Sequence, residues 1–169
     1  MLELKVYKGQ EEVELRFEHS LLSLSKWESK YRIAFLTDRQ KTPGELIDYF
    51  QFMLVDPDVD EDLVYLLTPE QQDEIVEYMN TPQTASHVPE DPKASKYNPE
   101  ITTSELIYYW MVALKINWEA QAWHLSRLMM LVQITGYKNQ PEKKRKPKEV
   151  YQDWIKENDR RRKMLGTNG

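Results

Sequence analysis

Two amphipathic helical patterns follow each other between Ser104 and Gly136, separated by a short break at Ile116–Asn117. Apolar residues recur at helical spacing on both sides of the break. Asn117 is a suitable N-cap for the second helix, and Gly136 is a suitable residue to end it. Because the connection is short, this stretch predicts an antiparallel helical hairpin in the C-terminal half of the chain.

The predicted hairpin carries more large apolar side chains than one helix face buries. An ordinary helical core is the simplest interpretation of them. The alternative is that some stay exposed or lie at a subunit contact, because Trp, Tyr and Met are enriched at protein interfaces. The candidate partner-binding residues on this basis are Tyr108, Tyr109, Trp110, Met111, Trp118, Trp123, Met129 and Met130.

The N-terminal residues predict a β-hairpin. Residues 2–7 and 13–17 alternate apolar and polar side chains, which is typical of strands with one buried face. The apolar sets are Leu2, Leu4 and Val6 on one strand and Val13, Leu15 and Phe17 on the other. An isolated two-stranded ribbon is marginally stable. It must therefore pack on helices of its own chain or pair with strands of another copy, which would give an oligomer.

Helix-start signals occur three times after the hairpin. Ser20 is a suitable N-cap for a helix reaching Leu36, with Leu21, Leu22, Leu24, Trp27 and Tyr31 as its apolar stripe. Thr42-Pro43 and Thr68-Pro69 each place an N-cap before a proline at the first helical position. The sequence therefore predicts an α+β, mainly α-helical fold, with about five to seven helices after the hairpin.

The chain divides into four regions by composition. Residues 1–80 hold the β-hairpin and acidic helices, and residues 81–100 form a Pro-rich loop or linker. Residues 101–137 hold the aromatic helical hairpin. Since a hairpin alone cannot bury two Trp-rich faces, we expect it to share one core with residues 1–80. Residues 138–169 form a basic, partly ordered tail with a final helix.

Charge is distributed unevenly along the chain. Residues 1–100 contain 10 Lys/Arg and 21 Asp/Glu, whereas residues 138–169 contain 11 and five. This asymmetry suggests a partner for the tail, or contact between tail and body. For the basic run, a solvated tail or one that binds an acidic partner is the favoured interpretation. Nucleic acid is disfavoured because the protein is acidic and its basic run contains no aromatic residue to stack on a base. The candidate tail residues are Lys143, Lys144, Arg145, Lys146, Lys148, Arg160, Arg161, Arg162 and Lys163.

The sequence contains no enzyme or metal signature. Asp56, Asp58 and Asp60 begin like a calcium loop, but Glu61 and Leu67 stand where glycine and glutamate are needed. The histidines, His19, His87 and His124, fall in separate predicted elements, and cysteine is absent. No nucleophile elbow or phosphate loop is present. We therefore expect no catalysis, no cofactor and no metal.

Targeting signals are also missing. No apolar run approaches the length of about 18 residues that a membrane span requires. Acidic residues occupy the N-terminal stretch where a secretory signal needs an apolar segment. We expect a protein of the cytoplasm that does not contact a membrane.

Two segments resemble a known protein family. Phe17–Tyr31, with its Ser-Lys-Trp-Glu sequence, and Ser104–Ile134, with its aromatic helices, resemble the tail assembly chaperones of long-tailed bacteriophages. The order of strand ribbon, acidic helices, aromatic helices and basic end is similar too. The likeness covers most of the chain, but it includes no motif whose residues have established roles.

The resemblance implies a non-enzymatic assembly factor of the host cytoplasm. Such chaperones coat the long helical tape measure protein, keep it soluble, and give way to tail tube subunits. Two other functions fit the residues. One is a structural or connector component of the virion, and the other is a nucleic-acid-binding accessory protein that uses the basic tail.

Overall fold

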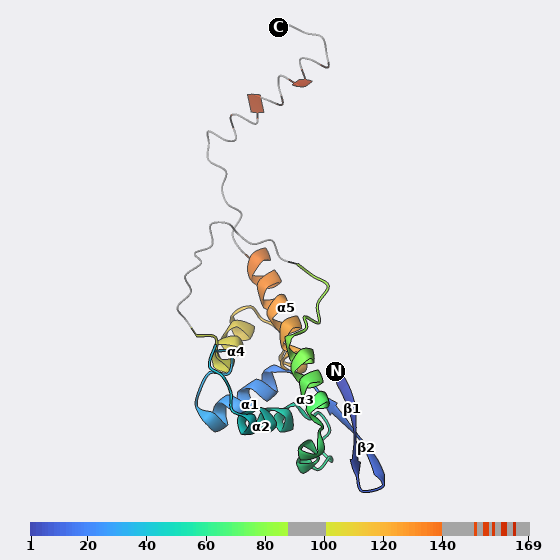
Figure 1. Cartoon of the computed structure of the whole chain (residues 1–169). Helices are drawn as coiled ribbons and strands as arrows, with labels where there is room; N and C mark the ends of the chain where they lie inside the picture. Colours follow the sequence, from blue (N-terminus) through green and yellow to red (C-terminus); the bar gives the residue numbers. More distant parts are fainter. Residues whose placement is uncertain are drawn as a thin grey trace. The chain divides into compact units, whose positions relative to one another are not determined.

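The chain folds into an α+β structure that is mainly helical, which confirms the predicted fold class. A computed structural model describes residues 1–87 and 101–139, together with Tyr151, Trp154, Ile155, Glu157, Arg160, Arg161 and Met164 of a further helix. The chain divides into two compact units, Met1–Lys138 and Asn139–Gly169. In the first unit an antiparallel β-hairpin precedes the helices (Figure 1).

The β-hairpin forms as predicted. Strand β1 (Leu2–Lys8) pairs with β2 (Glu11–Phe17), and Gly9 occupies the turn with a φ of 69° that favours glycine. In this register Leu4 lies opposite Leu15, so the apolar positions share one face. That face is buried in the core.

The hairpin packs against helices of its own chain, the first of the two predicted alternatives. The outer edge of β1 is approached by Gln71, whose side-chain amide donates a hydrogen bond of 2.8 Å to the carbonyl of Lys5. On the other side, the amide of Glu18 donates to the carbonyl of Met53 at 2.9 Å. These contacts satisfy backbone groups that an isolated ribbon would leave to water.

The three predicted helix starts are confirmed. Helices α1 (Leu21–Tyr31), α2 (Pro43–Met53) and α3 (Pro69–Asn80) begin after the N-caps Ser20, Thr42 and Thr68. Each N-cap forms a capping box, in which two backbone N–H groups of the first turn find acceptors. A short 3₁₀ helix, η1 (Glu61–Leu66), lies between α2 and α3.

Helix α1 is shorter than the sequence predicted. It ends at Tyr31 rather than Leu36, because Arg32 adopts a left-handed φ of 57° and its amide donates to the carbonyl of Glu28 at 2.7 Å. This geometry closes the helix. The predicted place of Leu22 in the apolar stripe was wrong, since its side chain is exposed.

The aromatic stretch forms three elements instead of two: α4 (Ser104–Ala113), the 3₁₀ helix η2 (Trp118–Ala122) and α5 (Leu125–Lys138). Asn117 caps η2 rather than a long helix. Between η2 and α5 the chain is extended, because His124 forms an antiparallel bridge with Ser20. The amide of Leu125 donates to the carbonyl of His19 at 2.7 Å, which fixes this crossing.

The structure differs from the predicted helical hairpin in two ways. Gly136 does not end the second helix, since α5 continues to Lys138 with the glycine inside it. The predicted hairpin also implied that its two helices pack mainly on each other. Instead, α4 packs mainly against α1, and η2 contacts both α1 and α5. The aromatic helices are therefore each fastened to the N-terminal part. One core cluster contains residues from both sides of the Pro-rich region, including Trp27, Tyr49, Ile107, Met111 and Leu128.

The helices of the described ranges give no sign of a membrane span. None of them is both long enough and apolar enough to cross a bilayer.

Candidate partner-binding groove

The predicted partner-binding residues divide between core and surface. Met111 is 1% exposed and belongs to the core. Tyr109, Trp118 and Trp123 are 65%, 53% and 40% exposed. The remaining four are partly buried: Tyr108, Trp110, Met129 and Met130. Only part of the set can therefore meet a partner directly.

Helix α5 is apolar on two faces. Leu125 and Leu128 are buried, and Met129 and Val132 pack beside them against the core. Three further apolar residues, Met130, Leu131 and Ile134, stay partly exposed on a second face. A helix that is apolar nearly all round is normally buried on all sides. The second face of α5 is therefore suited to a further contact.

A groove of about 380 Å³ runs along this second face. One wall consists of Trp123, which precedes α5, and of four residues that repeat at helical spacing on α5: Arg127, Met130, Leu131 and Ile134. The other wall is the extended segment 83–86 that follows α3. We call this feature the α5 groove. The α5 wall is mostly apolar, whereas the opposite wall contributes mostly polar residues, so the groove offers both kinds of contact to a partner.

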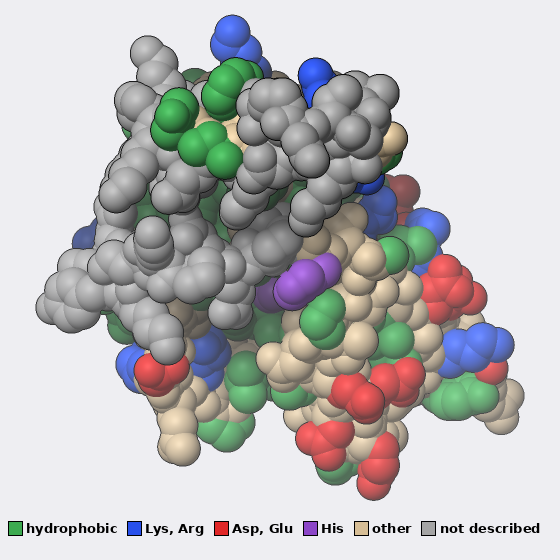
Figure 2. All heavy atoms as spheres, turned by 90° about the horizontal axis from the view of Figure 1, so that it is seen from above, with side chains coloured by type: hydrophobic (Ala, Val, Ile, Leu, Met, Phe, Trp, Pro, Cys, Tyr) green, Lys and Arg blue, Asp and Glu red, His purple; other side chains and the backbone are tan. Residues whose placement is uncertain are grey.

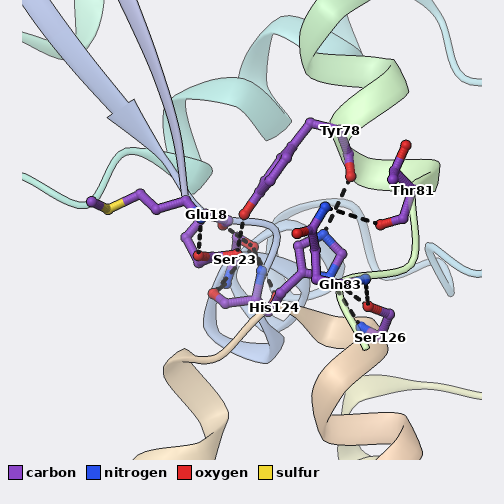
Figure 3. Close-up of polar contacts among 9 residues, drawn as sticks. Glu18, Ser23, Tyr78, Thr81, Gln83, His124 and Ser126 are labelled. Atoms are coloured by element: carbon purple, nitrogen blue, oxygen red, sulfur yellow. Dashed lines mark hydrogen bonds and ion pairs between the residues drawn. The ribbon is translucent and has the colours of Figure 1, made fainter. Parts of the chain in front are cut away.

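A polar network holds the second wall in place (Figure 3). The amide of Gln83 donates to the Ser126 hydroxyl at 2.9 Å, and that hydroxyl lies 2.9 Å from Nδ1 of His124. The Ser126 amide also donates to this nitrogen at 3.2 Å. On the other side of the ring, Nε2 lies 3.3 Å from the carbonyl of Tyr78.

These contacts fix the protonation of His124. The Tyr78 carbonyl can only accept, so Nε2 carries the proton and Nδ1 is the acceptor for Ser126. The Ser126 hydroxyl then donates to the ring and accepts from Gln83. Burial is the main cause that lowers the pKa of His124, and the nearby charge of Arg127 adds to it. The ring therefore stays neutral and keeps the wall attached to α5.

The network continues to a second buried histidine. His19 and His124 lie with ring centroids 5.4 Å apart, in an edge-to-face arrangement. Nδ1 of His19 lies 2.6 Å from the hydroxyl of Tyr49. Burial, followed by the repulsion that would arise if His124 were also protonated, lowers the pKa of His19 to about 3. The prediction of separate histidines missed this pair, because nothing in their spacing shows that Ser20 and His124 form a β-bridge.

The carboxylate of Glu18 borders the same region. It accepts from the hydroxyl of Tyr78 at 2.8 Å and pairs with the N-terminal amine of Met1 at 3.2 Å. Burial, followed by this hydrogen bond, raises the pKa of Tyr78. Tyr78 is thus a neutral donor, and the two histidines are uncharged. This polar cluster is therefore suited to holding α3 and the start of α5 against the segment that precedes α1.

A second exposed aromatic surface lies on α4 and η2. The rings of Tyr108 and Trp118 are 5.6 Å apart, and the Tyr108 hydroxyl donates to the side chain of Gln121 at 3.2 Å. Tyr109 and Val112 are exposed on the same helix as Tyr108. None of these residues lines a described pocket, so the α5 groove is the better-defined site.

The candidate basic residues are described only in part. Arg160 and Arg161 lie exposed on a helix of the second unit, and Arg161 pairs with Glu157 at 3.3 Å. Tyr151 and Trp154 stack on the same helix with centroids 6.2 Å apart. The other candidates lie outside the described residues: Lys143, Lys144, Arg145, Lys146, Lys148, Arg162 and Lys163.

The aspartates that resemble a calcium loop make structural contacts. Asp56 forms an ion pair with Arg16, and Asp60 pairs with Lys8 at 3.1 Å and caps η1. Within residues 1–87 and 101–139, no three His, Asp or Glu side chains converge to hold a metal ion.

Comparisons with protein-family models, with curated proteins and with solved structures found no match.

Proposed function

We propose that this protein is a non-enzymatic assembly chaperone that holds amphipathic helical segments of another protein in the α5 groove. The observation that supports it most is the second apolar face of α5, where Met130 and Ile134 remain partly exposed next to the exposed ring of Trp123. A helix laid into such a groove buries apolar area from both partners. The tape measure protein of a phage tail, which the sequence resemblance suggests, is the client that we propose.

The chemistry of the groove suits a client with a repetitive sequence. Met130 is flexible and polarizable, so it adapts to different apolar side chains. A tape measure is a long helix with more apolar surface than a protein exposed to water tolerates. Many chaperone copies, each covering a few turns, would bind weakly one by one and strongly together. Tail tube subunits could then displace them stepwise in the host cytoplasm.

The charge of the first unit supports the same role. Asp and Glu side chains gather along one side of the face shown in Figure 2, while hydrophobic side chains are visible at several other places on it. An acidic surface keeps coated filaments apart through mutual repulsion.

Co-expression tests the proposal. The chain is produced with the tape measure protein encoded beside it, and the soluble fraction and co-purification of that protein are measured. We expect both to increase with the native chain and to fall with Trp123→Ala. The control is Leu22→Ala, which removes an exposed apolar side chain on α1. No gain in solubility and no co-purification with the native chain would overturn the proposal.

A nucleic-acid-binding accessory role is a second candidate. It is favoured by the exposed Tyr151 and Trp154 on the helix that also exposes Arg160 and Arg161. Titration with DNA at increasing salt would then give a steep loss of affinity. Replacing both arginines with Gln should weaken that binding without affecting the folding of the first unit.

A further inference from the structure

We infer that the helix bound in the α5 groove carries carboxylates beside its apolar stripe, and that Arg127 recognises them. This inference rests on the proposed function of the groove and adds the chemistry of its client. The guanidinium carbon of Arg127 lies 5.2 Å from the centre of the Trp123 ring. Stacking on an aromatic face orients the guanidinium and leaves its N–H groups available at the edge of its plane.

The charges of the groove walls support an acidic client. Helix α5 contains two bases, Arg127 and Lys138, and no acid. The other wall and its neighbours, residues 81–87, contain no Asp, Glu, Lys or Arg. By contrast, residues 1–80 contain eight Lys/Arg and 18 Asp/Glu. The described walls are thus cationic in an acidic unit, so a carboxylate is attracted to the groove and repelled elsewhere.

The spacing of the wall residues sets the length of the client segment. From Arg127 to Ile134 the helical part of the wall extends over about two turns, or about 10 Å. A client helix of similar length can place apolar residues on Met130 and Leu131 while one carboxylate reaches Arg127. Arg and carboxylate groups form two parallel hydrogen bonds, so this contact also selects the register of the client.

Two designed peptides test the inference with the full-length chain. Both carry the same Leu stripe at helical spacing, and they differ only in whether Glu or Lys flanks the stripe. Fluorescence anisotropy of the labelled peptides measures each dissociation constant at low salt. We expect the native chain to prefer the Glu peptide by about fivefold, a preference that shrinks as salt rises.

Three variants separate the contribution of the Arg127 charge from that of the Trp123 ring. Arg127→Glu should reverse the preference, whereas Lys26→Glu, an equal charge change at an exposed position of α1, should leave it unchanged. Trp123→Ala should weaken both peptides. Thermal melts of each variant verify that the fold is retained.

The outcomes distinguish the two proposals. Equal binding of both peptides by the native chain, with no effect of Arg127→Glu, would overturn the acidic-client inference and leave the groove function standing. Failure of both peptides together with failure of the co-expression test would overturn the groove function itself. Preference for the Lys peptide by the native chain would also overturn the inference.

Discussion

The carboxylate of Glu28 accepts two hydrogen bonds from Ser104, one from its amide at 2.7 Å and one from its hydroxyl at 2.5 Å. A third hydrogen bond comes from the amide of Phe35 at 2.8 Å. Glu28 is buried, and Ser104 is the first residue of α4. The negative charge therefore lies at the positive end of the α4 dipole and joins α1 to the second half of the chain.

Replacing this carboxylate should destabilise the protein. In Glu28→Ala the amides of Phe35 and Ser104 lose their acceptor while they remain buried. We expect the free energy of unfolding to fall by about 2–3 kcal/mol, measured by urea denaturation. The matched control is Glu74→Ala, because Glu74 is exposed within α3 and its loss should change stability by less than about 0.5 kcal/mol. Equal effects of the two substitutions would contradict the role of Glu28.

Truncation of Trp27 should reduce stability, whereas truncation of Trp123 should reduce client binding. Trp27 is fully buried and donates to the carbonyl of Glu45 at 2.9 Å, so Trp27→Ala should cost about 3–5 kcal/mol of stability. Trp123 lies at the rim of the groove, so Trp123→Ala should cost less than about 1 kcal/mol of stability and weaken client binding. Thermal melts and the peptide titration measure the two effects. A large loss of stability in Trp123→Ala would place its ring in the core instead.

Ser126→Ala should loosen the groove without unfolding the protein. The substitution removes the acceptor for Gln83 and a donor to His124, so the wall 83–86 loses its attachment to α5. We expect client affinity to fall about fivefold, which corresponds to about 1 kcal/mol, while the melting temperature changes little. Hydrogen exchange of the Gln83 amide gives a direct readout. Unchanged exchange at that amide would show that the wall is held by other contacts.

The histidine pair should make stability depend on pH. In the folded chain the pKa of His19 is about 3 and that of His124 is also lowered, whereas unfolded histidines have a pKa of about 6.5. Below pH 6.5 the unfolded chain therefore takes up protons that the folded chain does not. The stability is fully present above pH 6.5 and declines as the pH falls toward 3.

The loss of stability at low pH can be measured, and a histidine variant provides the control. We expect the free energy of unfolding to fall by about 1–2 kcal/mol between pH 7 and pH 5, above the range in which carboxylates titrate. Charges that face the pair, from Glu18, Arg127 and the N-terminal amine, change the size of the effect but not its sign. His19→Asn, which can keep a hydrogen bond to Tyr49, should flatten the curve. An unchanged slope in that variant would contradict the assignment.

The end of α1 offers a stabilising substitution. Arg32 adopts a φ of 57°, which L-residues with side chains rarely adopt, and glycine is the preferred residue at this position. We expect Arg32→Gly to raise the free energy of unfolding by about 0.5–1 kcal/mol in urea denaturation. Ser29→Gly on the exposed face inside the same helix should lower it by a similar amount.

Local features of the fold could be predicted from the sequence, because the chemistry of a few neighbouring residues decides them. The alternating strands determine the hairpin, and Thr42 and Thr68 with their prolines determine where α2 and α3 begin. Contacts between distant segments escaped prediction. Nothing near His124 shows that its backbone pairs with Ser20, so a continuous helix was expected where η2 and α5 are separate elements.

The candidate site was predicted in part for the same reason. Trp123 and Met130 were identified because Trp and Met are common at interfaces, and both line the groove. Met111 was included with them but is buried, since helical periodicity does not tell which of two apolar faces meets the core. Arg127, Ser126 and Gln83 were missed, because their roles depend on a segment that reaches α5 only in the folded chain.

The bridge between Ser20 and His124 has a consequence for biosynthesis. The ribosome releases His19 and Ser20 long before His124 and Leu125, so the nascent chain cannot complete this crossing until most of the protein has been made. Folding of the first unit is therefore completed late in translation, and a product that stops after α3 lacks the residues that cover its buried polar groups.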